Sequence, residues 1–142
     1  MTEKSSNIVL VDDDEVYLFI ATKILKLLSK KLSVQTFTDG ERAMDFIKRK
    51  AGVPDPLPEV ILLDINMPYM DGWGFLREFQ KLRPNITKEV QIYLVTSSEN
   101  PDEKRRADEF GLLTGYIVKP ISKNKLKSIL TEVYDENFDS IK

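Results

Sequence analysis

The chain contains no cysteine and no histidine among its 142 residues. Without cysteine there is no disulfide, no thiol nucleophile and no cysteine-bound zinc. Without histidine there is no Ser-His-Asp or Cys-His machinery, no histidine metal ligand and no imidazole switch near neutral pH. Any chemistry must therefore come from carboxylates, hydroxyls, amides, lysine and arginine, and a bound metal should be a hard cation held by oxygen.

A strong net charge is also missing, because 21 basic residues oppose 23 acidic ones and leave a net charge of -2. Modules that bind nucleic acid normally carry a dominant basic face, so this balance argues against them. No apolar run approaches the roughly 18 residues that span a bilayer. The first residues also lack the apolar stretch of a signal peptide. We therefore expect a cytoplasmic protein.

Length and composition fit one compact domain, since 42% of the residues are hydrophobic and 31% are charged. We expect a single domain over residues 1–142, with its core at about 7–134 and a polar tail at 135–142. Short apolar runs rich in β-branched or aromatic residues predict strands covered on both faces, at 8–11, 60–63, 92–95 and 116–118. Residues 32–37 are more polar and predict a strand at the edge of the sheet.

The segments between these runs have the period of amphipathic helices. They cover residues 15–29, 41–49, 73–82, 101–110 and 122–134. Alternating strands and helices predict a parallel sheet with helices on both faces. In the first helix, we expect a buried stripe of Val16, Phe19, Ile20, Ile24, Leu27 and Leu28.

The helix at 101–110 has a thin apolar stripe, formed by Ala107 and Phe110. We expect it to be the least firmly anchored helix. Asn100 should cap it, and Glu103 should complete a capping-box-like arrangement.

Polar residues follow most of the expected strands. Asp12, Asp13 and Asp14 come after the first strand, Asp64 and Asn66 after the third, Thr96 at the end of the fourth, and Lys119 and Pro120 after the fifth. The carboxyl ends of parallel strands form the rim where ligands bind, so these side chains should converge.

Close carboxylates at this rim would need compensation, since a pair about 4 Å apart costs roughly 4 kcal/mol at an effective dielectric near 20. Mg²⁺ or Mn²⁺ would provide it, because both prefer oxygen ligands. Alternatively, the three consecutive aspartates only cap the following helix. Capping explains Asp14 well but three aspartates poorly, so we interpret Asp12 and Asp13 as metal ligands. Lys119 should point at the same acidic rim.

Four motifs at the strand ends resemble the receiver domain of two-component response regulators. They are residues 8–13 (IVLVDD), 62–72 (LLDINMPYMDG), 94–97 (LVTS) and 115–120 (GYIVKP). Each motif alone is weak, but the four in this order are specific, and the resemblance covers about residues 7–134. It implies a flavodoxin-like (βα)5 α/β fold, with a doubly wound parallel five-stranded sheet in the order 2-1-3-4-5.

The resemblance also implies roles for single residues. Asp64 would be the phosphoacceptor, Lys119 and Thr96 would bind the phosphoryl oxygens, and Thr96 with Tyr116 would act as the switch. Mg²⁺, with Mn²⁺ as an alternative, would be bound by Asp12, Asp13, Asp64 and the main-chain carbonyl of Asn66. Pro120 is a candidate for a cis peptide bond, and Gly72 would supply backbone freedom in the turn after the acceptor.

The implied function is a phosphorylation-dependent signalling switch. The phosphoryl group would come from a sensor histidine kinase or a histidine phosphotransfer protein, and no independent substrate turnover is expected beyond self-catalysed transfer and autodephosphorylation. The output would be a shift of the loop after strand 92–95 and of the surface formed by 101–110, 116–118 and 122–134, which controls a further protein. We expect a monomer or a weak dimer through that surface, with no direct contact to nucleic acid or membrane.

Other readings fit the sequence less well. A haloacid-dehalogenase-like phosphatase needs a second acid two residues after the nucleophile, where this chain has Asn66. A flavodoxin proper would not place three aspartates beside a flavin phosphate. A pseudo-receiver, which acts as an interaction module without phosphorylation, usually lacks one of the acids or the lysine, and this chain has them all.

We interpret Trp73, just after the acceptor turn, as a residue of the core rather than as a contact for a partner.

Overall fold

The computed structural model describes residues 6–51, 57–86, 88–97 and 100–134. The expected polar tail at 135–142 lies outside them. Strands and helices alternate along the chain: β1 (Ser6–Val11), α1 (Glu15–Leu28), β2 (Leu32–Phe37), α2 (Gly40–Lys50), β3 (Val60–Asp64), α3 (Gly72–Leu82) with a 3-10 turn (Arg83–Asn85), β4 (Gln91–Thr96), α4 (Pro101–Glu109), β5 (Leu113–Val118) and α5 (Lys123–Tyr134). The strands are parallel and follow the order β2-β1-β3-β4-β5, which confirms the predicted fold and the edge position of β2.

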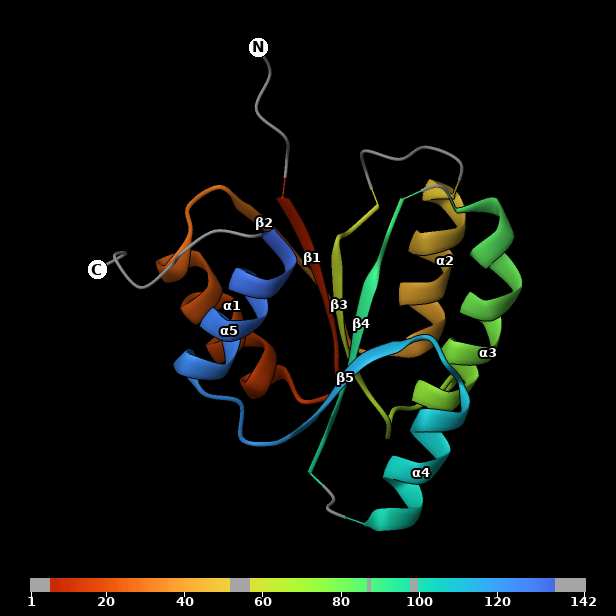
Figure 1. The fold of residues 1–142 in the computed structure, drawn as a ribbon. Coiled ribbons are helices and arrows are strands. Elements are labelled where there is room, and N and C mark those ends of the chain that lie inside the picture. The colour runs from red at the N-terminus through yellow and green to blue at the C-terminus, as the bar shows by residue number, and fades with distance from the viewer. Residues whose placement is uncertain (1–5, 52–56, 87, 98–99, 135–142) are drawn as a thin grey trace.

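The sheet separates two hydrophobic cores (Figure 1). Helices α1 and α5 cover one face, and α2, α3 and α4 lie on the other. Successive strand residues alternate between the cores, so Leu62 packs on one side and Leu63 on the other. Continuous apolar strands are therefore the ones buried on both faces, as expected for β1, β3 and β4. The expectation is wrong for β5, because it is the second edge strand and only Ile117 is buried in it.

Helix α1 turns a different face to the sheet from the one we expected. Its buried residues are Leu18, Ala21, Leu25 and Leu28. Val16, Phe19, Ile20 and Leu27 are between 51% and 70% exposed, so most of the predicted stripe faces solvent. The helix is apolar around most of its circumference, so two overlapping stripes have helical period and only packing selects between them. One consequence is an exposed apolar face on α1.

Side-chain caps define several helix starts. Asp14 accepts hydrogen bonds from the main-chain N–H groups of Val16 and Tyr17, so this aspartate is a cap. Asp71 caps α3 in the same way, and the Ser122 hydroxyl accepts from the N–H of Lys125 at the start of α5.

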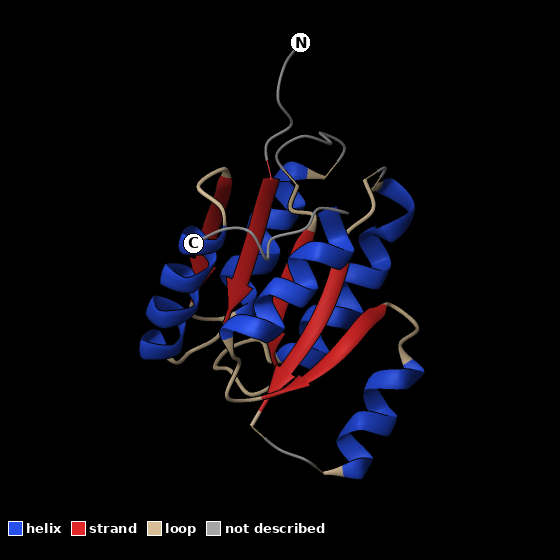
Figure 2. Ribbon diagram, turned by 60° about the vertical axis from the view of Figure 1, so that its left-hand side comes forward, coloured by secondary structure: helices blue, strands red, loops and turns tan. Residues whose placement is uncertain are grey.

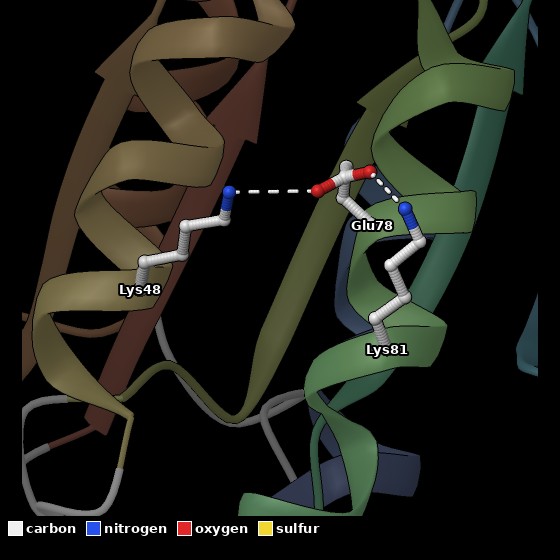
Figure 3. Close-up of polar contacts among 3 residues, drawn as sticks. All are labelled: Lys48, Glu78 and Lys81. Carbon is white, nitrogen blue, oxygen red and sulfur yellow. Dashed lines mark hydrogen bonds and ion pairs between the residues drawn. The ribbon is translucent and has the colours of Figure 1, made fainter.

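Helices α2 and α3 lie side by side and share an exposed ion-pair cluster (Figure 3). The Glu78 carboxylate of α3 lies 3.4 Å from the Lys48 ammonium of α2 and 3.0 Å from that of Lys81 one turn away. These two cations lower the pKa of Glu78. Such exposed pairs contribute little stability individually, so the apolar face beneath them carries the packing.

Helix α4 projects past the carboxyl ends of the strands (Figure 2). Ala107 is the one buried residue among its nine. At its end, Phe110 stacks on Trp73 of α3 with ring centroids 5.9 Å apart, and Gly111 stops the helix at φ +64°. The prediction of a thinly anchored helix is confirmed. Among the described residues, no helix has both the length and the apolarity needed to cross a bilayer.

Candidate functional site

Three carboxylates meet at the carboxyl end of the sheet. Val11 of β1 is aligned with Leu63 of β3, so the next residues, Asp12 and Asp64, emerge side by side from adjacent central strands. One oxygen from each of Asp12, Asp13 and Asp64 lies within 4.8 Å of the others. Asp12 is 1% exposed and Asp64 6%, whereas Asp13 is exposed. Hard oxygen donors at this spacing, partly shielded from water, suit a divalent cation.

The ammonium group of Lys119 offsets part of this charge. The Lys119 Nζ lies 2.6 Å from Asp12 Oδ2 and 4.6 Å from the centre of the Tyr17 ring. The Lys119 main-chain N–H donates to the Thr96 carbonyl at 2.7 Å, which fixes the chain where β5 ends. The Lys119–Pro120 bond is cis, as the sequence suggested. The structure thus confirms that Lys119 points into the acidic rim, and it adds Tyr17 as a neighbour that the sequence did not indicate.

Burial and neighbouring charges at the rim favour the protonated, neutral forms of Asp64, Asp12 and Tyr17. Burial, and after it the nearby Asp12 carboxylate, raise the pKa of Asp64 to about 7, although Lys119 opposes this rise. Burial also raises the pKa of Asp12, while its hydrogen bond with Lys119 acts in the opposite direction. The pKa of Tyr17 is raised by burial and then by Asp12 and Asp64. A second cation at the rim would relieve the same unfavourable interactions.

The turn after Asp64 depends on a close main-chain approach. A Cβ atom at Gly72 would lie 2.6 Å from the Asp64 carbonyl oxygen and 2.8 Å from Ile65 Cα, so no larger residue fits. Gly72 does not have positive φ, and our expectation that it supplies backbone freedom is therefore wrong. Positive φ occurs instead at Tyr69, which has φ 66° and is 88% exposed. Asn66, two residues after Asp64, is exposed, and its carbonyl as a metal ligand stays a prediction.

Thr96 and Tyr116 lie on neighbouring strands beneath α4. The Thr96 side chain is buried, and its hydroxyl donates a 2.8 Å hydrogen bond to Glu103 Oε1. The Tyr116 hydroxyl donates to the same oxygen at 2.9 Å. Burial, and then this carboxylate, raise the pKa of Tyr116 to about 12. Asn100 caps α4 as predicted, since its side chain accepts from the Asp102 N–H, and the Glu103 carboxylate joins the Thr96 and Tyr116 hydroxyls.

Trp73 lies in the core behind the site. It is 6% exposed, it stacks on Phe110, and the Arg106 guanidinium lies 4.4 Å from its ring centre. The interpretation of Trp73 as core packing is confirmed. Its ring also makes a direct contact between α3 and α4.

Comparison with known proteins identifies the class. The family model described as "Response regulator receiver domain" matches residues 8–131. The chain belongs to this family.

Individual relatives agree with this assignment. The chain is 26% identical to the "Probable methanogenesis regulatory protein FilR2" of Methanothrix harundinacea, over 89% of this chain and 79% of that protein. It is 32% identical to the "Sensor histidine kinase CheAY" of Helicobacter pylori, over 84% of this chain but only 14% of that protein. The crystal structure of a two-component response regulator from Cytophaga hutchinsonii matches with a TM-score of 0.77 and 25% identity, over 94% of this chain and all of that one (100%).

Proposed function

We propose that this chain is a phosphorylation-dependent signalling switch in which Asp64 accepts the phosphoryl group. The observation that carries the proposal is the meeting of Asp64 with two further aspartates and Lys119 at one rim. A carboxylate oxygen of Asp64 would attack the phosphorus of a phosphohistidine. The new P–O bond forms as the P–N bond breaks, and the released imidazole nitrogen takes up a proton from solvent. These 142 residues contain no histidine, so the donor histidine lies outside them.

The rim has the groups that such a transfer requires. We propose that Asp12, Asp13, Asp64 and the Asn66 carbonyl bind Mg²⁺, with Mn²⁺ as an alternative. The bound cation would offset the charge of the carboxylates and of the transferring phosphoryl group. Lys119, now paired with Asp12, would turn to a phosphoryl oxygen.

The exposed apolar face of α1 supports a protein donor. Val16 and Ile20 line a groove that continues to Lys119 and Ile121 at the rim, and Phe19, further along the same face, is 63% exposed. Large apolar side chains that stay in water next to a reactive site mark an interaction surface. We propose that a sensor histidine kinase or histidine phosphotransfer protein docks here, with apolar residues around its phosphohistidine.

The output surface is the face formed by α4, β5 and α5. Phosphorylation adds about -1.5 to -2 charge and strong acceptor oxygens at the rim. Thr96 would follow those oxygens, Tyr116 would follow Thr96, and α4, with one buried residue, would shift. Lys123 and Lys125 are exposed at the start of α5 and give the surface a basic flank for a downstream protein.

The test is intact-protein mass spectrometry after treatment with acetyl phosphate and Mg²⁺. The wild type and the control variant Asp45→Asn, which changes an exposed carboxylate on α2, should each gain the mass of one phosphoryl group. Asp64→Asn should gain none. Equal labelling of all three proteins would mean that Asp64 is not the acceptor, and labelling of none would favour a phosphorylation-independent interaction module. Asp13→Asn should bind Mg²⁺ more weakly than the wild type when Trp73 fluorescence reports the titration.

A further inference from the structure

One carboxylate of α4 holds both switch hydroxyls in the structure. Glu103 lies in the first turn of α4, Thr96 ends β4 and Tyr116 lies in the middle of β5. The two hydroxyls donate to the same oxygen, Glu103 Oε1, at 2.8 and 2.9 Å. Hydrogen bonds to a charged acceptor are stronger than neutral ones, and these two link one helix to both strands.

Strand register explains how the three residues meet. Thr96 is aligned with Val118, and Leu94 with Tyr116, so the Thr96 and Tyr116 side chains leave the sheet on the same face. Leu94 and Tyr116 pack in the core that α4 helps to cover. Glu103 reaches down from α4 onto that face. Thr96 directly follows Val95, the residue aligned with Asp64, so it lies one residue further toward the carboxyl end on the neighbouring strand.

We propose that Glu103 is a positioning residue that holds Thr96 away from the phosphoryl site in the unphosphorylated protein. This inference rests on the proposed function of Asp64. The Thr96 hydroxyl has a single proton, and here it is donated to Glu103. Donation to a phosphoryl oxygen therefore requires that the bond to Glu103 breaks. The Glu103 carboxylate opposes activation because it competes with the phosphoryl oxygens for the Thr96 hydroxyl proton. Its second hydrogen bond, from Tyr116, keeps α4 in place until Thr96 donates to the phosphoryl group instead.

Beryllofluoride, which mimics the aspartyl phosphate, provides the measurement. Its affinity in the presence of Mg²⁺ should rise about threefold to tenfold in Glu103→Gln, because the amide oxygen still accepts but without charge. Glu103→Ala removes the acceptor and should raise the affinity further. Thermal stability without beryllofluoride should stay equal or fall in both variants. A residue with only a structural role would give the opposite result, because general loosening of the site weakens binding.

The matched control is Asp102→Asn, in the same turn of α4. The Asp102 side chain is 77% exposed and pairs with Arg105, so the variant loses the same charge without touching Thr96 or Tyr116. Its beryllofluoride affinity should equal that of the wild type. An unchanged or lower affinity in Glu103→Gln and Glu103→Ala, or an equal rise in the control, would overturn the role of Glu103. If the wild type binds no beryllofluoride, or Asp64→Asn binds it equally well, the proposed function itself fails.

Discussion

Replacing Asp64 by asparagine should make the metal-free protein less sensitive to rising pH. The pKa of Asp64 rises from 3.8 to about 7 because the group is buried beside Asp12. This rise makes ionisation in the native protein roughly 4 kcal/mol less favourable than in the unfolded chain. Between about pH 4 and 7 the native protein keeps a proton that the unfolded chain has lost, so this group lowers stability as pH rises. Asparagine cannot ionise and avoids that loss.

The difference between the two proteins is the quantity to measure. Between pH 5 and pH 8, the free energy of unfolding of Asp64→Asn should rise by about 1–3 kcal/mol relative to that of the wild type. The lower value applies if the exposed Asp13 carboxylate moves away and raises the pKa of Asp64 less. For a chain of this length the rise corresponds to about 3–9 °C in Tm. Thermal unfolding in EDTA at the two pH values measures it, since all other titrating groups are shared. Asp45→Asn, on the surface of α2, should show no such gain.

Equal pH dependence of wild type and Asp64→Asn would refute this reasoning, because it would mean that the carboxylate ionises normally among its neighbours. Mg²⁺ adds a second comparison at pH 8. It should raise the Tm of the wild type and so reduce the difference in Tm between the wild type and Asp64→Asn, because the cation would offset the same negative charge that the substitution removes.

Other substitutions test the packing around the site. Leu18→Ala should lower the free energy of unfolding by about 2–4 kcal/mol, whereas Phe19→Ala should lower it by less than about 0.5 kcal/mol, because of the two only Leu18 faces the core. Urea denaturation measures both values. Similar losses in the two variants would contradict the face that α1 turns to the sheet. Gly72→Ala should lower the Tm markedly, because its methyl group would lie 2.6 Å from the Asp64 carbonyl oxygen. Gly74→Ala should leave the Tm unchanged or raise it, because its Cβ would lie 3.1 Å from the flexible Met70 Cγ and at ordinary contact distances of 3.5 and 3.7 Å from Asp71 Oδ1 and Arg77 Nη2. Phosphoryl transfer from a phosphohistidine protein that labels the wild type should be slower in Phe19→Ala, while labelling by acetyl phosphate should be unchanged.

The residues at the rim were predictable from sequence because they depend only on where strands end. Strands β1, β3 and β4 are buried on both faces, so each is a continuous apolar run, and the first polar residue after it marks the carboxyl end. Asp12 and Asp64 follow from that rule and from strand order, and Lys119 from the end of β5. These inferences need no side-chain packing.

Where several structural arrangements fit the same local sequence pattern, the sequence alone did not show which of them the folded chain adopts. Helix α1 carries apolar residues on both faces, so periodicity alone did not distinguish the buried Leu18 from the exposed Phe19. Gly72 could serve either positive φ or a close approach, and only the folded chain shows that a Cβ would collide with the preceding strand. The ring of Tyr17 against Lys119 likewise depends on how α1 sits on the sheet.

Glu103 shows why the polar contacts of α4 matter for a switch. Its position three residues after Asn100 fits a capping box, which can be recognised from neighbouring residues in the sequence. The hydroxyls that donate to its carboxylate belong to Thr96 and Tyr116, which lie on two strands and cannot be identified in that way. Ala107 is the one buried residue of α4, so the hydrogen bonds from Thr96 and Tyr116 add to the contacts of Phe110 and Arg106 with Trp73 in placing this helix. Such bonds can be exchanged for bonds to phosphoryl oxygens at small net cost, while buried apolar contacts cannot. Under the proposed function, a helix held in this way would be stable at rest and would respond to the charge and the acceptor oxygens that phosphorylation of Asp64 adds at the rim.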